Sequence, residues 1–552
     1  MKRLLPILIV LPILFPSCAK QGYPDGGPKD TQPPTSLLAT PANNTLNFAA
    51  PSFVIDFDEY IVLKSPDNNI LVSPPLAHKP EYTAKGKRVI VKIQDTLQPN
   101  TTYLFQFKNA IADFTEGNEL QSFEYAFSTG DHIDSMSIGG NVLDAQTYKP
   151  YEKEVTVLIY RLDEIDSIGD SCVVLLQPSY ITRCNKDGSF LFSHIAHGNY
   201  KIVALEDGDR NLRLNGDEAV AFSDTAISSS FRSDSSKNDT QQIALRLSKP
   251  DHQVQRITKS TFLQHGRVEI TSAAPIIRPV ISCSDSLIWT LSPTKDTLNI
   301  WTYQEQLDSL QVIVNDESGL NDTLKMKFKE KKGKKHIKNE KKKINDASLI
   351  RSLSPNSIGF FDTLHLLFEN PIVDVKDSSV VCLDCQDSTT SRGSIRVDST
   401  QTHGWIDLDL ASGHSYKVTI PSQTLTDIYQ HTNDSLSFNV EILGSDKFGN
   451  IFILPTLNPG DNHIFQLTDE NGKIIQSIPW KEGSKRVEFR HVKPGKYKIQ
   501  VLFDNNHDGK WTPGDYWLHR QPETILFYNK TLDVRENWDI EEKWNLLDKT
   551  RK

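Results

Sequence analysis

The fold is decided by a stretch that occurs twice, at 189–218 as SFLFSHIAHGNYKIVALEDGDRNLRLNGDE and at 486–515 as RVEFRHVKPGKYKIQVLFDNNHDGKWTPGD. The two copies align without a gap, so that Phe192 corresponds to Phe489 and Tyr200 to Tyr497. In each copy, alternating apolar residues flank a turn that contains glycine, which is the pattern of two β-strands joined by a tight turn. An Asp-rich loop follows the second strand. The sequence therefore predicts a duplicated β-structured unit.

A second repeated pattern precedes each copy. Its first occurrence contains Leu97-Gln-Pro-Asn-Thr-Thr-Tyr103, Ala112-Asp113, Gly117-Asn118 and Phe127-Ser-Thr129. Its second occurrence contains Leu410-Ala-Ser-Gly-His-Ser-Tyr416, Thr426-Asp427, Asn433 and Phe438, without the Pro and without a Gly before Asn433. The chain is therefore interpreted as a two-domain unit that occurs twice, with an insert between the copies.

These motifs carry two family resemblances. The pattern L-x-P-x-T-x-Y, D, G-N and F-x-T resembles the bacterial Ig-like domain first recognised in S-layer proteins. The pattern F-x-F-x-x-I/V-x-x-G-x-Y, with Ile138-Gly-Gly-Asn-Val-Leu-Asp144 before its first copy, resembles the transthyretin-like, carboxypeptidase-regulatory-type β-sandwich. The resemblances imply an all-β fold, a tandem array of Ig-like and transthyretin-like β-sandwiches. They do not imply one function, because such folds have many.

The length of 552 residues suggests about four to five domains. Short alternating strands separated by Asn, Asp, Gly and Pro clusters fill nearly all of the chain after the first residues. We expect the following division: a signal peptide at 1–17, a lipidated Cys and flexible tether at 18–34, an Ig-like domain at 35–131, a transthyretin-like sandwich at 135–250, a sandwich of uncertain type at 251–328, a Lys-rich linker at 329–346, a degenerate Ig-like domain at 347–443, and a second transthyretin-like domain with a C-terminal tail at 444–552.

The N-terminus predicts the location. Lys2 and Arg3 precede an apolar run, Leu4–Phe15, and then Pro16-Ser17-Cys18. This is the pattern of a secretion signal, and the run is shorter than the roughly 20 residues that span a bilayer. A Cys after a small residue resembles a bacterial lipobox, which implies a mature chain anchored by lipid, palmitate included, on Cys18. The alternative is an ordinary secretion signal with an incidental Cys.

The charge is distributed unevenly. The segment Lys325–Lys343 holds eleven Lys and two Glu, a charge of +9, while the whole chain carries −9, so the remainder carries −18. An acidic body argues against nucleic acid as a partner. The basic run is interpreted as a solvated linker, with anionic lipid or lipopolysaccharide phosphate as the alternative partner.

The cysteines predict a disulfide. Cys172 and Cys184 lie twelve residues apart across an expected turn and are candidates for pairing in an oxidising envelope. Cys382 and Cys385 form a C-x-x-C without a second pair of ligands at zinc-like spacing, and their flanks indicate strand and loop rather than a helix start. This favours a local disulfide or two free thiols over a zinc site or a thioredoxin-like redox site.

Both Asp-rich loops are candidate calcium sites, because calcium prefers six to eight oxygen ligands at this spacing. In the loop at 504–515, the oxygen ligands expected are those of Asp504, Asn506, Asp508, Lys510 (by its carbonyl) and Asp515, with Gly509 at the turn. In the loop at 207–218 they are those of Asp207, Asp209, Asn211 and Glu218, with Leu212 in place of the turn Gly. The alternative for each loop is a turn held by side-chain hydrogen bonds to its own backbone.

The chain has no G-x-S-x-G, H-E-x-x-H, P-loop or dinucleotide-binding glycine pattern. We therefore expect a non-enzymatic protein, with covalent lipid and candidate calcium as its only cofactors. The expected function is a lipid-anchored binding or scaffold subunit at the cell surface, such as an accessory subunit of an outer-membrane transport or assembly complex. Its expected partners are the outer membrane, through the lipid, and an outer-membrane protein, but no nucleic acid. The alternatives are a glycan-binding surface protein or adhesin and, less favoured, a hydrolase.

Overall fold

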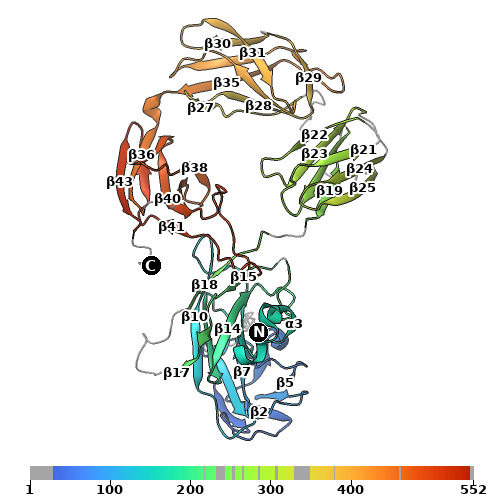
Figure 1. Cartoon of the computed structure of the whole chain (residues 1–552), viewed down its shortest axis with the longest axis vertical. Coiled ribbons are helices and arrows are strands. Elements are labelled where there is room, and N and C mark those ends of the chain that lie inside the picture. Colours follow the sequence, from blue (N-terminus) through green and yellow to red (C-terminus); the bar gives the residue numbers. More distant parts are fainter. Residues whose placement is uncertain are drawn as a thin grey trace, which may run out of the picture.

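The computed structural model describes residues 29–216, 218–231, 243–251, 255–263, 266–283, 286–304, 309–327, 349–377, 379–458 and 462–547. Over these residues the chain is nearly all β-structure, which confirms the predicted all-β array of sandwiches (Figure 1). The signal peptide, Cys18 and the Lys-rich linker lie outside the described residues. Among the helices of the described ranges, none has the length and apolar character needed to cross a membrane.

The first sandwich packs a sheet of order β1-β2-β6-β5 against one of order β4-β7-β9, with β3 paired to β8. Its elements are β1 (Ser36–Thr40), β2 (Ser52–Phe57), β3 (Ile61–Leu63), α1 (Pro66–Asn69), β4 (Leu71–Ser73), β5 (Glu81–Lys85), β6 (Arg88–Lys92), β7 (Thr102–Lys108), β8 (Ile111–Asp113) and β9 (Phe123–Ser128). The alternation in SFVIDF makes β2 buried at every second residue, as expected for a strand with one face in the core. The core is aromatic: Phe53 stacks on Tyr125 with ring centroids 4.0 Å apart and meets Phe105 edge-on at 5.0 Å.

The second sandwich places a sheet of order β13-β10-β17, extended by β18 parallel to β10, against a sheet of order β12-β11-β14-β15. Its elements are β10 (Met136–Asp144), β11 (Thr156–Arg161), α2 (Leu162–Ile165), η1 (Gly169–Ser171), α3 (Cys172–Leu175), β12 (Tyr180–Arg183), β13 (Ser189–Ile195), β14 (Asn199–Leu205), β15 (Val220–Phe222), β16 (Ile227–Ser228), β17 (Ser230–Phe231) and β18 (Ile243–Leu247).

The sheet formed by β12, β11 and β14 is buried on both faces, so that five consecutive residues of β11 are buried. Alternate residues of β11 belong to two different hydrophobic clusters, one between the two sheets and one beneath the α2–α3 segment. The second of these clusters, which we call the outer cluster, also contains Leu71 of the first sandwich and Tyr516 of the last.

The third sandwich consists of sheets of order β19-β20-β23-β22 and β21-β24-β25 around its own core. Its strands are β19 (Ile257–Phe262), β20 (Arg267–Ser272), β21 (Val280–Cys283), β22 (Leu287–Leu291), β23 (Thr297–Thr302), β24 (Ser309–Asn315) and β25 (Asn321–Lys327). The basic run therefore begins within a strand, because Lys325 lies in β25.

The fourth sandwich is one sheet of order β26-β28-β32-β31-β30-β33-β35-β27 that closes around a core, with β29 paired to β34. Its strands are β26 (Ile350–Leu353), β27 (Ser357–Gly359), β28 (Leu364–Phe368), β29 (Ile372–Val375), β30 (Val380–Asp384), β31 (Thr390–Val397), β32 (His403–Asp407), β33 (Ser415–Ile420), β34 (Leu425–Asp427) and β35 (Leu436–Leu443). Strand β31 joins the two halves, because it pairs with β30 through its first residues and with β32 through its last.

The fifth sandwich repeats the topology of the second: β36 pairs with β39 antiparallel and with β43 parallel, as β10 does with β13 and β18. Its elements are η2 (Ser445–Lys447), β36 (Gly449–Thr456), β37 (His463–Thr468), β38 (Ile474–Pro479), β39 (Val487–Val492), β40 (Gly495–Phe503), β41 (Ile525–Phe527), β42 (Leu532–Val534) and β43 (Asp539–Asn545). The expected C-terminal tail thus supplies an edge strand, β43, up to Asn545.

The duplication extends to single hydrogen bonds of tyrosine. Tyr200 and Tyr497 each donate from the hydroxyl to the carbonyl four residues earlier, at 2.7 and 2.9 Å. Tyr103 and Tyr416 each accept at the hydroxyl from the backbone N–H five residues earlier, at 3.0 and 2.7 Å. Such tyrosine corners fix the path of the chain at the end of a sandwich.

In each copy of the repeated hairpin, a residue with left-handed backbone lies within the first strand, before the turn that contains glycine. His194 and His491 occupy equivalent positions with φ of 58° and 54°, each near a register shift in its strand pair. Gly495 has a φ of 155°, whereas Gly198 is not among the residues with positive φ. The shared distortion is therefore a bulge at histidine rather than a turn at glycine.

The sandwiches contact each other beyond their chain connections. Arg267 of the third sandwich, whose side chain is 7% exposed, donates to the Glu369 carboxylate of the fourth at 3.0 Å. The Trp301 indole of the third sandwich donates to the Glu369 backbone carbonyl at 3.3 Å. His491 of the fifth sandwich stacks on Phe361 of the fourth with ring centroids 4.6 Å apart. A loop of the fifth sandwich reaches the second (Figure 1).

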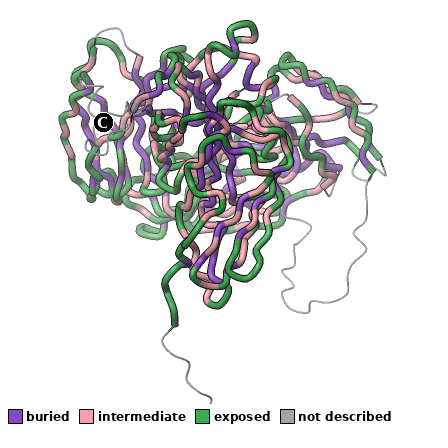
Figure 2. Tube along the Cα trace, turned by 90° about the horizontal axis from the view of Figure 1, so that it is seen from below, coloured by how far each residue is buried: buried purple, intermediate pink, exposed green. Residues whose placement is uncertain are grey.

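The second, third, fourth and fifth sandwiches therefore form a closed circuit, and the first is attached to the second outside it (Figure 1). Viewed along the perpendicular direction, buried residues follow the strands inside each sandwich and exposed residues follow the connecting loops (Figure 2). Each sandwich has a core of its own, and the circuit is closed by side chains at the junctions.

Candidate functional site

The two Asp-rich loops, which begin where β14 and β40 end, have the same internal bonding. Asp207 accepts hydrogen bonds from the backbone N–H groups of Asn211 at 3.1 Å and Leu212 at 3.0 Å. Asp504 accepts from the N–H groups at the equivalent positions, Asp508 and Gly509, at 3.1 and 3.0 Å. The same backbone therefore folds around the first Asp of each loop.

The bonds made by the third and fifth positions also match. Asp209 accepts from the Asn211 N–H at 3.2 Å, and Asn211 accepts from the Arg213 N–H at 2.7 Å. In the second loop, Asn506 and Asp508 accept from the corresponding N–H groups at 3.1 and 2.8 Å. The side chains at positions 1, 3 and 5 are therefore held by the backbone of their own loop in the same way in both copies.

The two loops differ in backbone strain at the sixth position, where the chain turns. Leu212 and Gly509 both occupy the left-handed region, with φ of 59° and 77°. Glycine adopts that conformation freely, whereas a leucine there is strained by about 1–3 kcal/mol. The first loop thus retains the shape of the second despite the loss of its glycine.

A glutamate closes each loop by the same pair of hydrogen bonds, but it stands at a different distance from the first Asp in the two copies. Glu218 accepts from the N–H groups of Gly208 at 3.2 Å and Asn215 at 3.1 Å, the second and ninth positions. In the second loop the same two bonds, from Asn505 at 2.7 Å and Thr512 at 3.0 Å, go to Glu523. Glu523 is therefore the counterpart of Glu218.

Asp515, the predicted twelfth-position ligand, has a different role. Its carboxylate accepts from the N–H groups of Trp517 at 2.9 Å and Leu518 at 3.0 Å and so caps the next turn. The gapless alignment placed Asp515 opposite Glu218 because the second copy carries eight additional residues before its closing glutamate. Glu523 stands two residues before β41, as Glu218 stands two residues before β15, and this shared spacing is the sequence signal for the closing glutamate.

Three carboxyl groups of these loops lie in surroundings that disfavour their ionised form: the first Asp of the first loop and the closing glutamate of each loop. Burial raises the pKa of Asp207, and the charge of Asp209 raises it further. Burial, with Asp207 and Asp209 nearby, raises the pKa of Glu218, and burial, with Asp504 nearby, raises the pKa of Glu523. Ligand atoms of Asp207, Asp209 and Glu218 all lie within 4.8 Å of one another, close enough to bind one cation.

The eight additional residues lie within an arm, residues 513–522, that docks on the second sandwich. Tyr516 is 2% exposed, donates from its hydroxyl to the Asp170 carbonyl at 3.0 Å, and lies edge-on to Phe222 with centroids 5.3 Å apart. The Lys201 ammonium lies 4.9 Å from the centre of the Tyr516 ring, and the His519 imidazole lies 2.8 Å from the Asp170 carboxylate. The arm therefore fills the outer cluster with an aromatic ring and surrounds that ring with polar contacts.

Backbone groups on both sides reinforce this junction. The Gly514 N–H donates to the Ser248 hydroxyl at 2.9 Å, and the Gln521 amide donates to the Phe222 carbonyl at 3.0 Å. Because the arm begins directly after Thr512, its start is tied to the bonding of the second Asp-rich loop.

The predicted Cys172–Cys184 disulfide is corrected by the structure. Both thiols are free, and they lie in the two clusters on opposite faces of the β12-β11-β14 sheet. Burial raises the pKa of Cys184 to about 12 and also raises that of Cys172, so both remain protonated at neutral pH. Cys382 and Cys385 are likewise free thiols.

Comparison with known proteins supports the fold of the first sandwich: residues 30–129 match the bacterial Ig-like domain family. No curated protein matches the sequence.

Solved structures similar to this chain include the Bacillus anthracis TIE protein, at 10% identity over 95% of this chain and 75% of that chain, with a TM-score of 0.16. Others are the surface layer protein SbsC, domains 1–6, at 10% identity over 91% and 67%, with a TM-score of 0.14, and the Bacteroides ovatus mixed-linkage glucan utilization locus protein SGBP-B in complex with a mixed-linkage heptasaccharide, at 10% identity over 72% and 93%, with a TM-score of 0.19. Scores this low carry no inference about function.

Replacing Tyr516 by Ala should open the circuit. Truncating a buried aromatic side chain typically costs about 3–5 kcal/mol, which is a large share of the stability of a junction of this kind. We expect the radius of gyration measured by small-angle X-ray scattering to increase, and protease cleavage within 513–522 to become faster. Leu518→Ala is the matched control, because Leu518 is 60% exposed on the same arm and should leave both unchanged. Unchanged scattering and proteolysis of the Tyr516 variant would show that the arm does not hold the circuit closed.

Proposed function

We propose that this protein is a non-enzymatic, lipid-anchored scaffold of the bacterial outer membrane that binds an envelope protein, and that it acts as an accessory subunit of a transport or assembly complex. The observation that carries the proposal is the closed circuit of four sandwiches. Its junctions, from Arg267–Glu369 to Tyr516–Asp170, fix separate surfaces relative to one another. A fixed array presents a broad surface to a partner, and stable protein interfaces need about 1,200–2,000 Å² of such surface.

Exposed aromatic residues support protein binding rather than catalysis. Trp517 and Leu518 are 55% and 60% exposed on the arm, beside the junction of the second and fifth sandwiches. Large apolar side chains exposed in this way are enriched at the centre of protein interfaces. The same residues are compatible with stacking on sugars, which is the reason to keep glycan binding as the alternative.

The test of the partner is a pull-down of the membrane-extracted protein in mild detergent, followed by mass spectrometry. We expect a stoichiometric outer-membrane protein to be recovered, and we expect Trp517→Ala to reduce its recovery several-fold. Trp538→Ala is the matched control, since Trp538 is also 55% exposed but lies on the edge of the fifth sandwich. Recovery of the protein alone, together with binding to a glycan array, would replace the scaffold proposal by the glycan-binding one.

The lipid anchor depends on one residue. Cys18→Ala removes the only thiol that a lipobox at this position could modify, so we expect the protein to move from the membrane to the soluble fraction. Fractionation followed by immunoblotting measures the change. Cys283→Ala serves as the control and should leave the protein in the membrane. A Cys18 variant that remains membrane-bound would contradict the anchor.

We further propose that calcium binds both Asp-rich loops. The ligands in the first loop are Asp207, Asp209, Asn211, the carbonyl of Arg213, and Glu218. Those in the second loop are Asp504, Asn506, Asp508, the carbonyl of Lys510, and Glu523, which replaces the predicted Asp515. The support is the identical backbone bonding of the two loops and the convergence of three carboxylates in the first. In this position the ion stiffens the loop that leads into the arm rather than taking part in catalysis.

Calcium should raise the melting temperature, with an apparent gain of about 2.7 kcal/mol at a concentration one hundred times the dissociation constant. Glu523→Gln should remove most of the calcium-induced shift of the second loop, while Asp515→Asn should retain the shift even if the melting temperature without calcium falls. A shift lost equally in both variants would contradict the assignment of Glu523. Differential scanning calorimetry with and without chelator measures each shift.

The pH dependence follows from the raised pKa values of Asp207, Glu218 and Glu523. Because their folded-state pKa lies above the ordinary values of 3.8 and 4.5, these groups favour the folded state while protonated, and that stabilisation is lost as the pH rises through the raised pKa. Calcium binds the ionised form, so the calcium-induced shift should be larger at pH 7.5 than at pH 4.5. Equal shifts at both pH values would contradict binding through these carboxylates.

A further inference from the structure

Two exposed aromatic side chains lie on neighbouring loops at one end of the first sandwich. Tyr60, 63% exposed, lies between β2 and β3, and Phe114, 73% exposed, follows β8. The Phe114 N–H donates to the Tyr60 carbonyl at 2.9 Å, so the two loops are joined. A single exposed ring is ordinary on a protein surface, whereas two rings on joined loops form a small apolar surface.

The backbone holds Phe114 in its exposed position. The buried Asp113 carboxylate accepts hydrogen bonds from three N–H groups of the following loop, those of Glu116 at 2.6 Å, Gly117 at 2.9 Å and Asn118 at 2.7 Å. Because the loop is fixed in this way, its ring is presented to a partner with little further loss of backbone freedom.

The chain enters the first sandwich at the same end. The Thr35 N–H donates to the Asp58 carboxylate at 2.8 Å, and the Asp58 N–H donates to the Thr35 carbonyl at 3.1 Å. The Asn118 amide donates to the Asp30 carbonyl at 3.1 Å. Residues 29–35 therefore contact both loops that carry the aromatic rings.

The proposed lipid would keep this end close to the membrane. Cys18 and Lys29 are eleven residues apart in the sequence. An extended chain spans at most about 3.6 Å per residue, so a lipid on Cys18 would hold the aromatic loops within about 40 Å of the bilayer. At such a high effective concentration, a surface too weak to bind a membrane alone becomes sufficient, which is why Cys18→Ala is still expected to release the protein.

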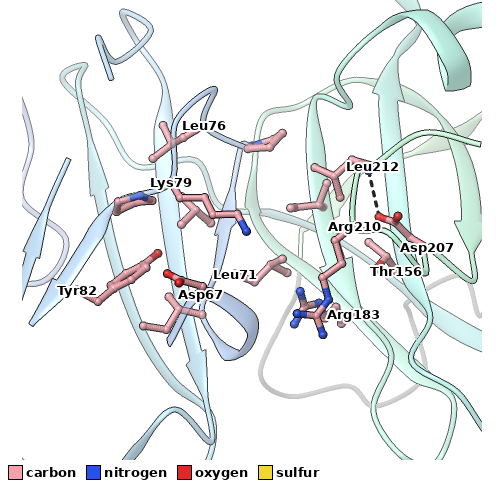
Figure 3. Close-up of a pocket in the computed structure, with 15 residues that line it drawn as sticks. Asp67, Leu71, Leu76, Lys79, Tyr82, Thr156, Arg183, Asp207, Arg210 and Leu212 are labelled. Atoms are coloured by element: carbon pink, nitrogen blue, oxygen red, sulfur yellow. Dashed lines mark hydrogen bonds between the residues drawn. The ribbon is translucent and has the colours of Figure 1, made fainter. Parts of the chain in front are cut away.

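The junction with the second sandwich uses a different part of the first. There, residues 67–82 face the second sandwich across a cavity of about 130 Å³ (Figure 3). Neither Tyr60 nor Phe114 lines this cavity. The first sandwich also lies at one end of the longest axis of the molecule (Figure 1). The surface formed by the two rings is therefore open to a partner outside the molecule.

The charges around the rings are mainly negative. Burial, followed by the charges of four nearby carboxylates, raises the pKa of Glu59; these are Asp113, Asp58, Asp30 and Glu116. The same neighbourhood shows that the loops of Tyr60 and Phe114 and the entering chain bring five carboxyl groups to this end.

Fewer cations lie there. Among the described residues, the exposed cations at this end are Lys29, Lys85 and Lys87. The Lys87 ammonium lies 5.9 Å from the centre of the Tyr60 ring. Two further cations are already paired, as Lys64–Glu119 and Arg88–Asp56. In a zwitterionic phospholipid the amine is the outermost charged group and the phosphate lies deeper, so an excess of carboxylates favours a zwitterionic surface over an anionic one.

We propose that this end of the first sandwich rests on a zwitterionic phospholipid surface, with Tyr60 and Phe114 inserted among the head groups and the carboxylates facing the amines. Aromatic rings favour this depth, because tyrosine combines an apolar ring with a polar hydroxyl. The inference rests on the proposed anchor and adds a second membrane contact, since one acyl signal alone gives only marginal binding. It also adds an orientation, in which the first sandwich faces the lipid and the circuit points away.

The test places a tryptophan at the surface, as Phe114→Trp in the full-length protein reconstituted into vesicles of phosphatidylethanolamine and phosphatidylcholine. The eight tryptophans of the chain all lie at position 289 or later, so the added indole is alone in the first two sandwiches and the parent protein gives the background. With brominated acyl chains in the phosphatidylcholine, the added emission should be lost, because bromine quenches an indole that reaches the lipid. Adding anionic phosphatidylglycerol should restore part of this emission.

Leu46→Trp is the matched control. Leu46 is 43% exposed in the loop that joins β1 to β2, and this loop lies at the opposite end of the hairpin from the Ser36–Phe57 pair. Its added emission should be unchanged by bromine. Tyr60→Trp is a second reporter, in case Phe114→Trp lowers the melting temperature.

Failure of the anchor is distinguished by flotation. Protein that does not float with the vesicles would contradict the lipid on Cys18, and the same variants, with hexahistidine in place of residues 1–18 and nickel-chelating lipid in the vesicles, then test the surface alone. Vesicle-bound protein in which neither reporter is quenched, or in which the Leu46 variant is quenched equally, would overturn the proposal.

Discussion

The architecture depends on covering the outer face of one sheet. In the second sandwich, β11 and β14 carry apolar side chains on both faces, so the sheet cannot be stable with its outer face in water. The α2–α3 segment covers only part of that face. Leu71 from the first sandwich and Tyr516 from the fifth occupy the remainder. The hydrophobic requirement of one sheet therefore determines where the two neighbouring sandwiches are held.

The same requirement separates the two copies of the duplicated unit, the second and fifth sandwiches. They share strand order, the tyrosine corners and the bonding of the Asp-rich loop. They differ by the arm that precedes Glu523, which has no counterpart before Glu218. The first copy has the apolar outer face of the β12-β11-β14 sheet, and the second copy supplies Tyr516, which packs on that face. The surfaces of the two copies are thus complementary to each other.

The sequence was sufficient for the features that depend on local pattern. Alternation and turn residues predicted the sandwiches, and the spacing in the repeats predicted equivalent residues such as Tyr200 and Tyr497. It was insufficient for features that depend on three-dimensional proximity. A gapless alignment placed Asp515 where Glu523 belongs, because the eight-residue insertion leaves the loop pattern before it intact. The spacing of Cys172 and Cys184 suggested a disulfide. The two thiols lie on opposite faces of a sheet that is buried on both sides, so they cannot pair. Arg183 and Arg210 are far apart in the sequence of the second sandwich, so no local pattern predicted that both would approach Glu154.

The closed circuit has a mechanical consequence. A force applied between the N-terminal end and a partner on the fourth sandwich would pass through the first sandwich into the second and would then divide. One branch runs along the covalent chain through the third sandwich, and the other runs through the Tyr516 contact into the fifth. Each branch bears only part of the load, and release of the noncovalent branch would lengthen the molecule without unfolding any sandwich. The Tyr516 junction would then act as an extensible link in an otherwise stiff chain.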